Sequence, residues 1–132
     1  MRSLPRAFTI LVVEDYALIA LEVEDAVRRN GGQVLGPVAN IADALKLLDD
    51  VACDAALLDI RLLNGETAYQ VAERLQAQTI PFAFVTAWDG DIDARFVDVP
   101  VLRKPFGEVE LDACLRALMD RTAMPAGERR AA

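Results

Sequence analysis

The sequence predicts a doubly wound α/β domain, in which a five-stranded parallel sheet of order 2-1-3-4-5 carries helices on both faces. Two observations support this fold class. Short apolar runs alternate with longer segments of helical periodicity, and strands separated by helices pair in parallel through right-handed crossovers. The runs are apolar at successive positions, which is typical of strands covered on both faces. With 132 residues, 54% of them hydrophobic, the chain can form one domain with a buried core.

The first half of the chain supplies two expected strands and two expected helices. Residues 8–13 are an apolar run of strand length, and residues 16–30 repeat apolar side chains at three- and four-residue spacing, which predicts a helix. Residues 33–38, bounded by glycine and proline, are expected to form the second strand. Residues 41–48 are expected to form a short helix, with Asn40 as its N-cap.

The second half supplies three strands and the remaining helices. Residues 54–60 contain an Ala-Ala-Leu-Leu run that predicts the third strand, and residues 66–76 have the pattern of a helix. Residues 82–86 and 99–102 are expected to be the fourth and fifth strands, and residues 108–121 the final helix. Any helix between the fourth and fifth strands is expected to be short or irregular, because that stretch holds a glycine and several Asp and β-branched residues.

Composition and organisation exclude several classes of function. We expect an N-terminal extension at residues 1–7, the domain at residues 8–123, and a flexible tail at residues 124–132 that is too short for an effector domain. The net charge of -7 argues against a nucleic-acid surface. No apolar stretch approaches the roughly 18 residues of a membrane span, so we expect a cytoplasmic protein. The absence of histidine excludes a histidine-based triad and a histidine-ligated zinc site.

Polar side chains stand at the ends of four of the expected strands. Glu14 and Asp15 follow the first strand, Asp59 ends the third, Thr86 ends the fourth, and Lys104 follows the fifth. The carboxyl ends of parallel strands lie along one edge of the sheet, and ligands bind there at the switch point between strands one and three. The three carboxylates are therefore expected to converge at that point, with the threonine and the lysine beside them.

These residue types suit phosphoryl transfer. Three neighbouring carboxylates repel one another, and a hard divalent cation such as Mg²⁺ or Mn²⁺ relieves the repulsion. A carboxylate can act as nucleophile and form an acyl phosphate, while a metal ion, an ammonium group and a hydroxyl donor position the phosphoryl group. Singly, an Asp after a strand is usually a helix N-cap, and a threonine or lysine there is usually structural or solvated. Their joint occurrence along one edge favours the chemical interpretation.

With these residues in view, the chain resembles the bacterial receiver domains of two-component response regulators, the CheY-like family. The matching segments are residues 10–15 (Ile-Leu-Val-Val-Glu-Asp), 56–60 (Ala-Leu-Leu-Asp-Ile), 84–87 (Phe-Val-Thr-Ala) and 102–106 (Leu-Arg-Lys-Pro-Phe). The resemblance covers residues 9–118 and implies a flavodoxin-like fold. It also implies a function in signal transduction, which the residue types alone leave open.

The resemblance implies a role for each matching residue. Asp59 is the phosphoacceptor, Thr86 hydrogen-bonds the phosphoryl group, and Lys104 pairs with it. The implied Mg²⁺ ligands are Glu14 (through water), Asp15, Asp59 and the backbone carbonyl of Arg61. The donor is a phosphohistidine on a sensor histidine kinase, and the domain is no enzyme beyond its own phosphorylation and dephosphorylation. It signals to a downstream protein as a monomer or weak homodimer, or serves as a phosphate sink or shuttle in a phosphorelay.

Two departures from the family pattern concern the switch and the acceptor loop. Val101 stands where most receivers have an aromatic side chain that swings inward, and Leu63 stands where most have a proline. Residues 84–88 (Phe-Val-Thr-Ala-Trp) resemble, imperfectly, the Phe-Ala-Thr-Gly signature of an atypical and often single-domain subgroup, the FAT-GUY receivers. The resemblance therefore predicts a switch that does not use an aromatic swing.

Two expectations follow for the behaviour of a phosphorylated chain. Arg61 and Trp88 flank the expected path of an attacking water, which predicts slow loss of the phosphoryl group unless both face solvent or a partner. Residues 88–97, with their glycine and acidic side chains, are expected to be mobile in the free protein and to become ordered on phosphorylation.

Three other functions compete with a phosphorylated receiver. A phosphatase or dehalogenase with an aspartate nucleophile needs a second Asp where Arg61 stands. A flavodoxin-like cofactor binder needs a phosphate loop rich in Gly, Ser or Thr, where this chain has Glu-Asp-Tyr-Ala at residues 14–17. A pseudo-receiver that is never phosphorylated remains as an interaction module, and the complete set of site residues disfavours it.

Overall fold

The structure is a computed structural model that describes residues 7–87 and 90–121. The strands are β1 (Thr9–Val13), β2 (Gln33–Val38), β3 (Ala55–Asp59), β4 (Phe82–Thr86) and β5 (Val101–Arg103). The helices are α1 (Ala17–Arg29), α2 (Ile41–Asp50), α3 (Tyr69–Ala77), the 3₁₀ helix η1 (Ala94–Phe96) and α4 (Glu108–Arg121). Trp88, the expected tail and residues 1–6 lie outside the described residues.

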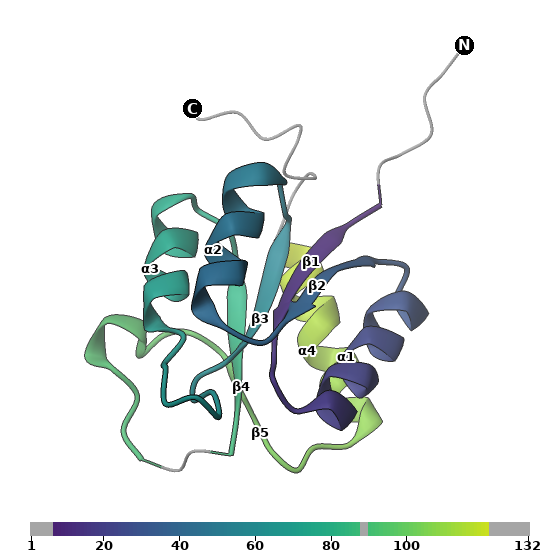
Figure 1. The fold of residues 1–132 in the computed structure, drawn as a ribbon. Coiled ribbons are helices and arrows are strands. Elements are labelled where there is room, and N and C mark those ends of the chain that lie inside the picture. The colour runs from purple at the N-terminus through teal and green to yellow at the C-terminus, as the bar shows by residue number, and fades with distance from the viewer. Residues whose placement is uncertain (1–6, 88–89, 122–132) are drawn as a thin grey trace.

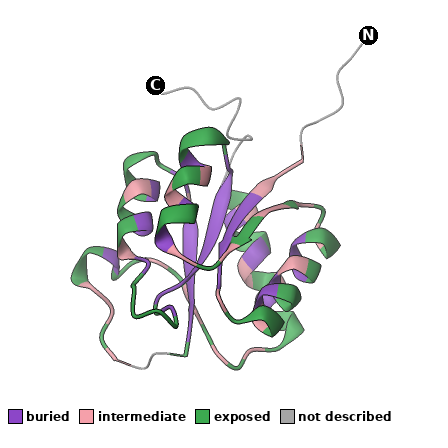
Figure 2. Cartoon of the chain, in the orientation of Figure 1, coloured by how far each residue is buried: buried purple, intermediate pink, exposed green. Residues whose placement is uncertain are grey.

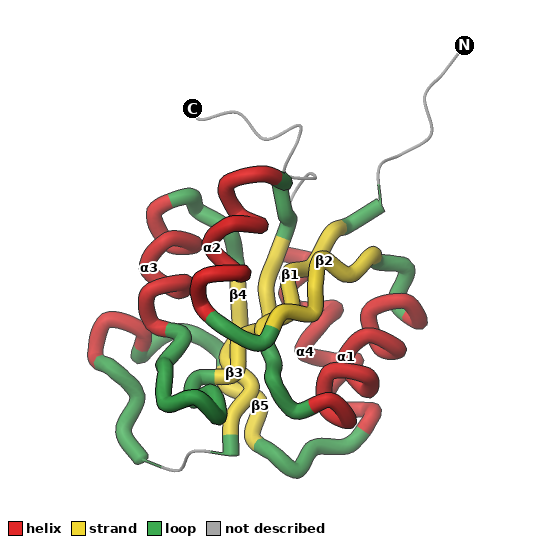
Figure 3. Tube along the Cα trace, viewed as in Figure 1, coloured by secondary structure: helices red, strands yellow, loops and turns green. Residues whose placement is uncertain are grey.

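The five strands form one parallel sheet in the order β2-β1-β3-β4-β5, which confirms the predicted fold class (Figure 1, Figure 3). Helices α2 and α3 cover one face of this sheet, and α1 and α4 cover the other (Figure 1). Because all strands run in the same direction, their carboxyl ends lie along a single edge, the lower edge in Figure 1. This edge carries every residue of the predicted site.

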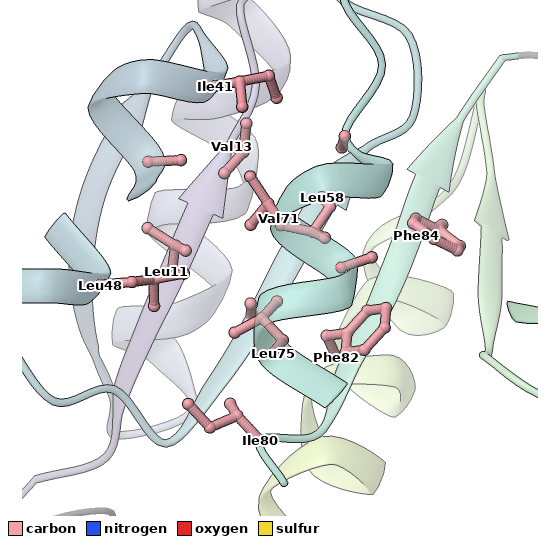
Figure 4. Packing of buried hydrophobic residues seen from close by; sticks show 14 of the residues in the cluster. Leu11, Val13, Ile41, Leu48, Leu58, Val71, Leu75, Ile80, Phe82 and Phe84 are labelled. Atoms are coloured by element: carbon pink, nitrogen blue, oxygen red, sulfur yellow. The ribbon is translucent and has the colours of Figure 1, made fainter. Parts of the chain in front are cut away.

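Both faces of the sheet are buried, which explains why the strand sequences are apolar at successive positions. In β1, Leu11 and Val13 pack in the cluster with α2 and α3, whereas Ile10 and Val12 pack in the cluster with α1 and α4. Figure 4 shows the first cluster, and Figure 2 shows buried strands between helices whose outer faces are exposed. Each large aliphatic side chain buried this way contributes roughly 1.5–3 kcal/mol, so the site edge belongs to a well-packed platform.

Helix α3 begins at Tyr69, so the predicted start at Glu66 is wrong. The chain before α3 folds back on itself instead, and Arg61 pairs with Thr67 in an antiparallel bridge. The carboxylate of Glu66 is turned toward α2, where its Oε1 accepts the N–H of Ile41 at 3.2 Å. A contact between distant parts of the chain thus overrides the local helical pattern.

The remaining boundaries lie close to the predicted ones. Asn40 caps α2 as predicted, because its Oδ1 accepts the N–H of Asp43 at 2.8 Å. Helix α2 continues to Asp50, and β5 begins at Val101, later than the apolar run suggests. In the described part of the chain, no helix is both long enough and apolar enough to span a membrane.

In the described residues of the connection between β4 and β5 (87 and 90–100), the one helical element is the single turn η1, which confirms the predicted short or irregular fourth helix. Phe96 anchors this turn, because its side chain is fully buried. Its ring stacks on the ring of Tyr69, with centroids 5.5 Å apart, and meets Phe84 of β4 edge-on at 5.9 Å. The short turn is therefore held against α3 and β4 by aromatic packing.

Candidate functional site

Three carboxylates meet at the carboxyl edge of the sheet, between β1 and β3. The sheet register pairs Val13 with Leu58, so the residues that follow them, Glu14 and Asp59, are neighbours across the two strands. Asp15 is the next residue along the chain. One oxygen from each carboxylate lies within 4.8 Å of the other two. The strand order predicted this convergence, and the structure contains it.

Lys104 reaches this cluster from the end of β5. Its Nζ lies 2.8 Å from Oε1 of Glu14 and 3.1 Å from Oδ2 of Asp59. Both carboxylates are almost completely buried, and the lysine side chain is 15% exposed. One ammonium group is therefore shared between two buried acids, in a place where ion pairs are screened less by solvent than at the surface.

The electrostatics of the cluster are dominated by burial. Desolvation raises the pKa of Glu14 to about 7, and the negative charge of Asp59 adds to the rise, although the hydrogen bond from Lys104 opposes it. Burial alone would lower the pKa of Lys104, but its hydrogen bond to Glu14 and the charges of both acids raise it instead. The cluster holds more acidic groups than its single ammonium can neutralise, which favours binding of a cation.

The surroundings of Asp15 and Asp59 contradict the ordinary alternative of a helix N-cap. The N-cap position of α1 is Tyr16, whose side chain makes no capping hydrogen bond. Asp15 instead accepts the backbone N–H of Leu63 through its Oδ2. Asp59 ends β3, and the next helix along the chain starts only at Tyr69. Both carboxylates therefore face the site and do not accept hydrogen bonds from the N–H groups at the start of a helix.

Thr86 and Arg61 complete the predicted set. Thr86 ends β4 and is buried, and its carbonyl accepts the N–H of Lys104 at 2.9 Å, which ties the ends of β4 and β5 together. Arg61 lies two residues beyond Asp59 and is exposed, with its backbone in the bridge to Thr67. The threonine thus borders the site, whereas metal ligation by the Arg61 carbonyl stays a prediction.

The donor set fits a hard divalent cation. Carboxylate oxygens are the ligands that Mg²⁺ and Mn²⁺ prefer, and Mg²⁺ is usually held by one or two carboxylates, with water and phosphate oxygens completing the shell. Asp15 is partly exposed, so the cluster opens to solvent on one side. Sequence reasoning from side chains misses Leu63, because its contribution is a backbone N–H.

Solved structures similar to this chain are known, although no protein-family model and no curated protein matches it. SdrG from Sphingomonas melonis Fr1 is 42% identical with a TM-score of 0.76, and the match covers 86% of this chain and 97% of SdrG. The BeF3-activated conformation of SdrG, from Pseudomonas melonis Fr1, is 43% identical with a TM-score of 0.71, covering 84% and 95%. The REC domain of the PhyR response regulator from Erythrobacter litoralis is 25% identical with a TM-score of 0.77, covering 90% and 95%.

Proposed function

The chain belongs to the CheY-like receiver domains of response regulators, and from this membership we propose that it is a phosphorylated signalling switch. In this proposal Asp59 accepts a phosphoryl group from a phosphohistidine of a sensor histidine kinase, in a reaction that requires Mg²⁺. The phosphorylated chain then signals by contact with another protein. A phosphate sink or shuttle uses the same chemistry without that downstream contact.

The observation that carries the proposal is the position of Asp59, which lies within 4.8 Å of two further carboxylates and 3.1 Å from the Lys104 ammonium. An Asp59 oxygen forms a bond to phosphorus while the phosphorus–nitrogen bond of the donor breaks. The departing imidazole nitrogen keeps the electron pair and takes a proton from solvent. The reaction needs positioning and charge neutralisation rather than a further catalytic base.

The side chains around Asp59 supply that positioning. Asp15 and Asp59 would hold Mg²⁺ directly, Glu14 through water, and Arg61 through its carbonyl. When bound, the cation neutralises charge on the phosphoryl oxygens. The Lys104 ammonium, which pairs with the carboxylates of Glu14 and Asp59, would gain a phosphoryl oxygen as a further partner.

Output through a conformational change is supported by the relative SdrG, which has a BeF3-activated conformation. A phosphoryl group adds about -1.5 to -2 charges next to Thr86, at the end of β4. In the described residues of the connection that follows β4, the backbone forms one short turn, η1. We infer that a partner protein recognises a surface that includes this connection.

The test is covalent modification in the presence and absence of the metal. The purified chain is incubated with acetyl phosphate and MgCl₂, and its intact mass is measured. The proposal predicts a gain of one phosphoryl group that is abolished by EDTA and by Asp15→Ala. Absence of any gain under all conditions would support the pseudo-receiver alternative, and an equal gain with EDTA would rule out the metal dependence.

A further inference from the structure

A backbone amide lies directly against one of the carboxylates of the site. The N–H of Leu63 donates a hydrogen bond to Oδ2 of Asp15, although the two residues are 48 positions apart in sequence. The Leu63 side chain itself is 78% exposed. The contribution of Leu63 to the site is therefore its peptide group and not its hydrophobic side chain.

The loop that carries Leu63 is held in place by its own hydrogen bonds. Gly65 donates its N–H to the carbonyl of Leu62 at 3.0 Å, so residues 62–65 form a turn with Leu63 at its second position. The N–H of Leu62 donates to the carbonyl of Glu66 at 2.9 Å, and the Leu62 side chain is buried. This turn presents the Leu63 amide in a fixed direction.

The far side of the same loop is fastened to α2. Asn64 accepts the N–H of Glu66 at 2.9 Å and donates to its carboxylate at 2.7 Å. That carboxylate also accepts the N–H of Ile41 at 3.2 Å, at the first residue of α2. The loop is thus held to the rest of the domain at both ends. Its position does not depend on Asp15, so the Leu63 N–H can fix the orientation of the Asp15 carboxylate.

We propose that Leu63 is a positioning residue for metal binding, whose backbone N–H fixes the orientation of the Asp15 carboxylate toward Glu14 and Asp59. The proposal rests on the proposed function, because Asp15 is a metal ligand only if the chain is a metal-dependent receiver. A carboxylate offers about four lone-pair sites, so accepting one N–H leaves oxygen positions available for a cation. Groups that orient a metal ligand in this way typically contribute about 10- to 100-fold to metal affinity.

The residue type at position 63 decides whether this hydrogen bond can exist. Proline has no backbone N–H, so a proline at this position could not donate a hydrogen bond to Asp15. This chain has Leu63, and the donor is present. The departure from the family pattern therefore adds a function to the loop instead of removing one.

The sharpest test compares Leu63→Pro with Leu63→Ala. Proline is favoured at the second position of such a turn, and the side chain there is exposed, so Leu63→Pro removes the N–H with little other change. Leu63→Ala shortens the side chain and keeps the N–H. We expect titration calorimetry to find Mg²⁺ affinity about 10-fold weaker in Leu63→Pro and unchanged in Leu63→Ala. Equal affinity in the two variants would overturn the proposal.

A second measurement needs neither metal nor a folded proline variant. Amide exchange of Leu63 in the metal-free protein should be slow in the wild type and at least about tenfold faster in Asp15→Ala, which removes the acceptor. An unchanged exchange rate would overturn the proposal. A failure of the proposed function would give another result than a failure of the Leu63 proposal. The wild type itself would then bind no Mg²⁺ and gain no phosphoryl group from acetyl phosphate.

Discussion

Lys104 and Glu14 form a buried ion pair, with the lysine Nζ 2.8 Å from the glutamate Oε1. The same ammonium lies 3.1 Å from Oδ2 of Asp59, the proposed phosphoacceptor. One ammonium group is thus shared by an acid that would contact the metal through water and an acid that would carry the phosphoryl group. Binding of a divalent cation or of a phosphoryl group changes the negative charge that this ammonium group neutralises.

Removing the shared ammonium should destabilise the metal-free protein. Lys104→Met keeps the length of the side chain but leaves two buried carboxylates without their cation, which should lower the free energy of unfolding by about 2 kcal/mol. The loss is limited because Glu14 can take up a proton. Urea denaturation without metal measures it. Lys46→Met is the control, since Lys46 forms an exposed pair with Asp50, and its effect should stay within about 0.5 kcal/mol.

Metal binding and stability should depend on pH through Glu14. Its pKa is raised from 4.5 to about 7 by burial, so the folded metal-free chain binds this proton more tightly than the unfolded chain does. The stability gained from that proton is complete below pH 4.5 and is lost as the pH rises to about 7. Mg²⁺ competes with the same proton, so its affinity should increase from pH 6 to pH 8. Glu14→Gln should flatten both dependences, and an unchanged pH profile in this variant would contradict the assignment to Glu14.

The lifetime of the phosphoryl group should depend on Arg61. This exposed side chain lies two residues beyond Asp59, on the expected approach of an attacking water. Replacing it with alanine should accelerate loss of the phosphoryl group several-fold, because hydrolysis needs a water in line with the breaking bond. Decay of the phosphorylated mass after removal of the donor measures the rate. The same decay in wild type and Arg61→Ala would mean that the side chain leaves the approach open.

The connection between β4 and β5 should become more ordered on phosphorylation. In the unphosphorylated protein, Tyr69 should limit the opening of this connection through its contacts with Asp93 and Phe96. The Asp93 N–H donates to the Tyr69 hydroxyl at 3.2 Å, and the Tyr69 ring stacks on Phe96. Tyr69→Phe removes only the hydroxyl and should speed amide exchange at Asp93 by several-fold while leaving the buried Phe96 in place. Wild-type residues 90–97 should exchange more slowly with BeF₃⁻ bound than without it.

The switch is not expected to use an inward-swinging aromatic side chain at position 101. Val101, half-buried in β5 and paired with Phe84, has no ring to exchange between positions. Strong protection of residues 90–97 in the free protein that is unaltered by BeF₃⁻ would show that the switch lies elsewhere in the chain.

The placement of the site was predictable because it depends on strand order and register. Once apolar runs and helices alternate, parallel pairing brings the ends of β1 and β3 together, and Glu14 and Asp59 become neighbours whatever the details of packing. Lys104 could be placed beside them for the same reason. Which carboxylate oxygens it contacts depends on side-chain packing that no sequence pattern encodes.

The loop after Asp59 shows where sequence reasoning fails. Glu66 has the pattern of a helical residue, but its carboxylate bonds the Ile41 amide of a distant helix, and α3 starts later. The contact from Leu63 to Asp15 is made by a peptide group, which every residue except proline has, so residue type gives almost no signal for it. Both features depend on long-range geometry that only the folded chain reveals.

The most direct measurement is the intact mass of the Asp59→Asn variant after incubation with acetyl phosphate and Mg²⁺, beside wild type and Asp50→Asn. Asp50 is an exposed carboxylate at the end of α2 and serves as a matched control for loss of one acid. Wild type and Asp50→Asn should each gain one phosphoryl group, and Asp59→Asn should gain none. An equal gain in Asp59→Asn would contradict the assignment of Asp59 as the phosphoacceptor.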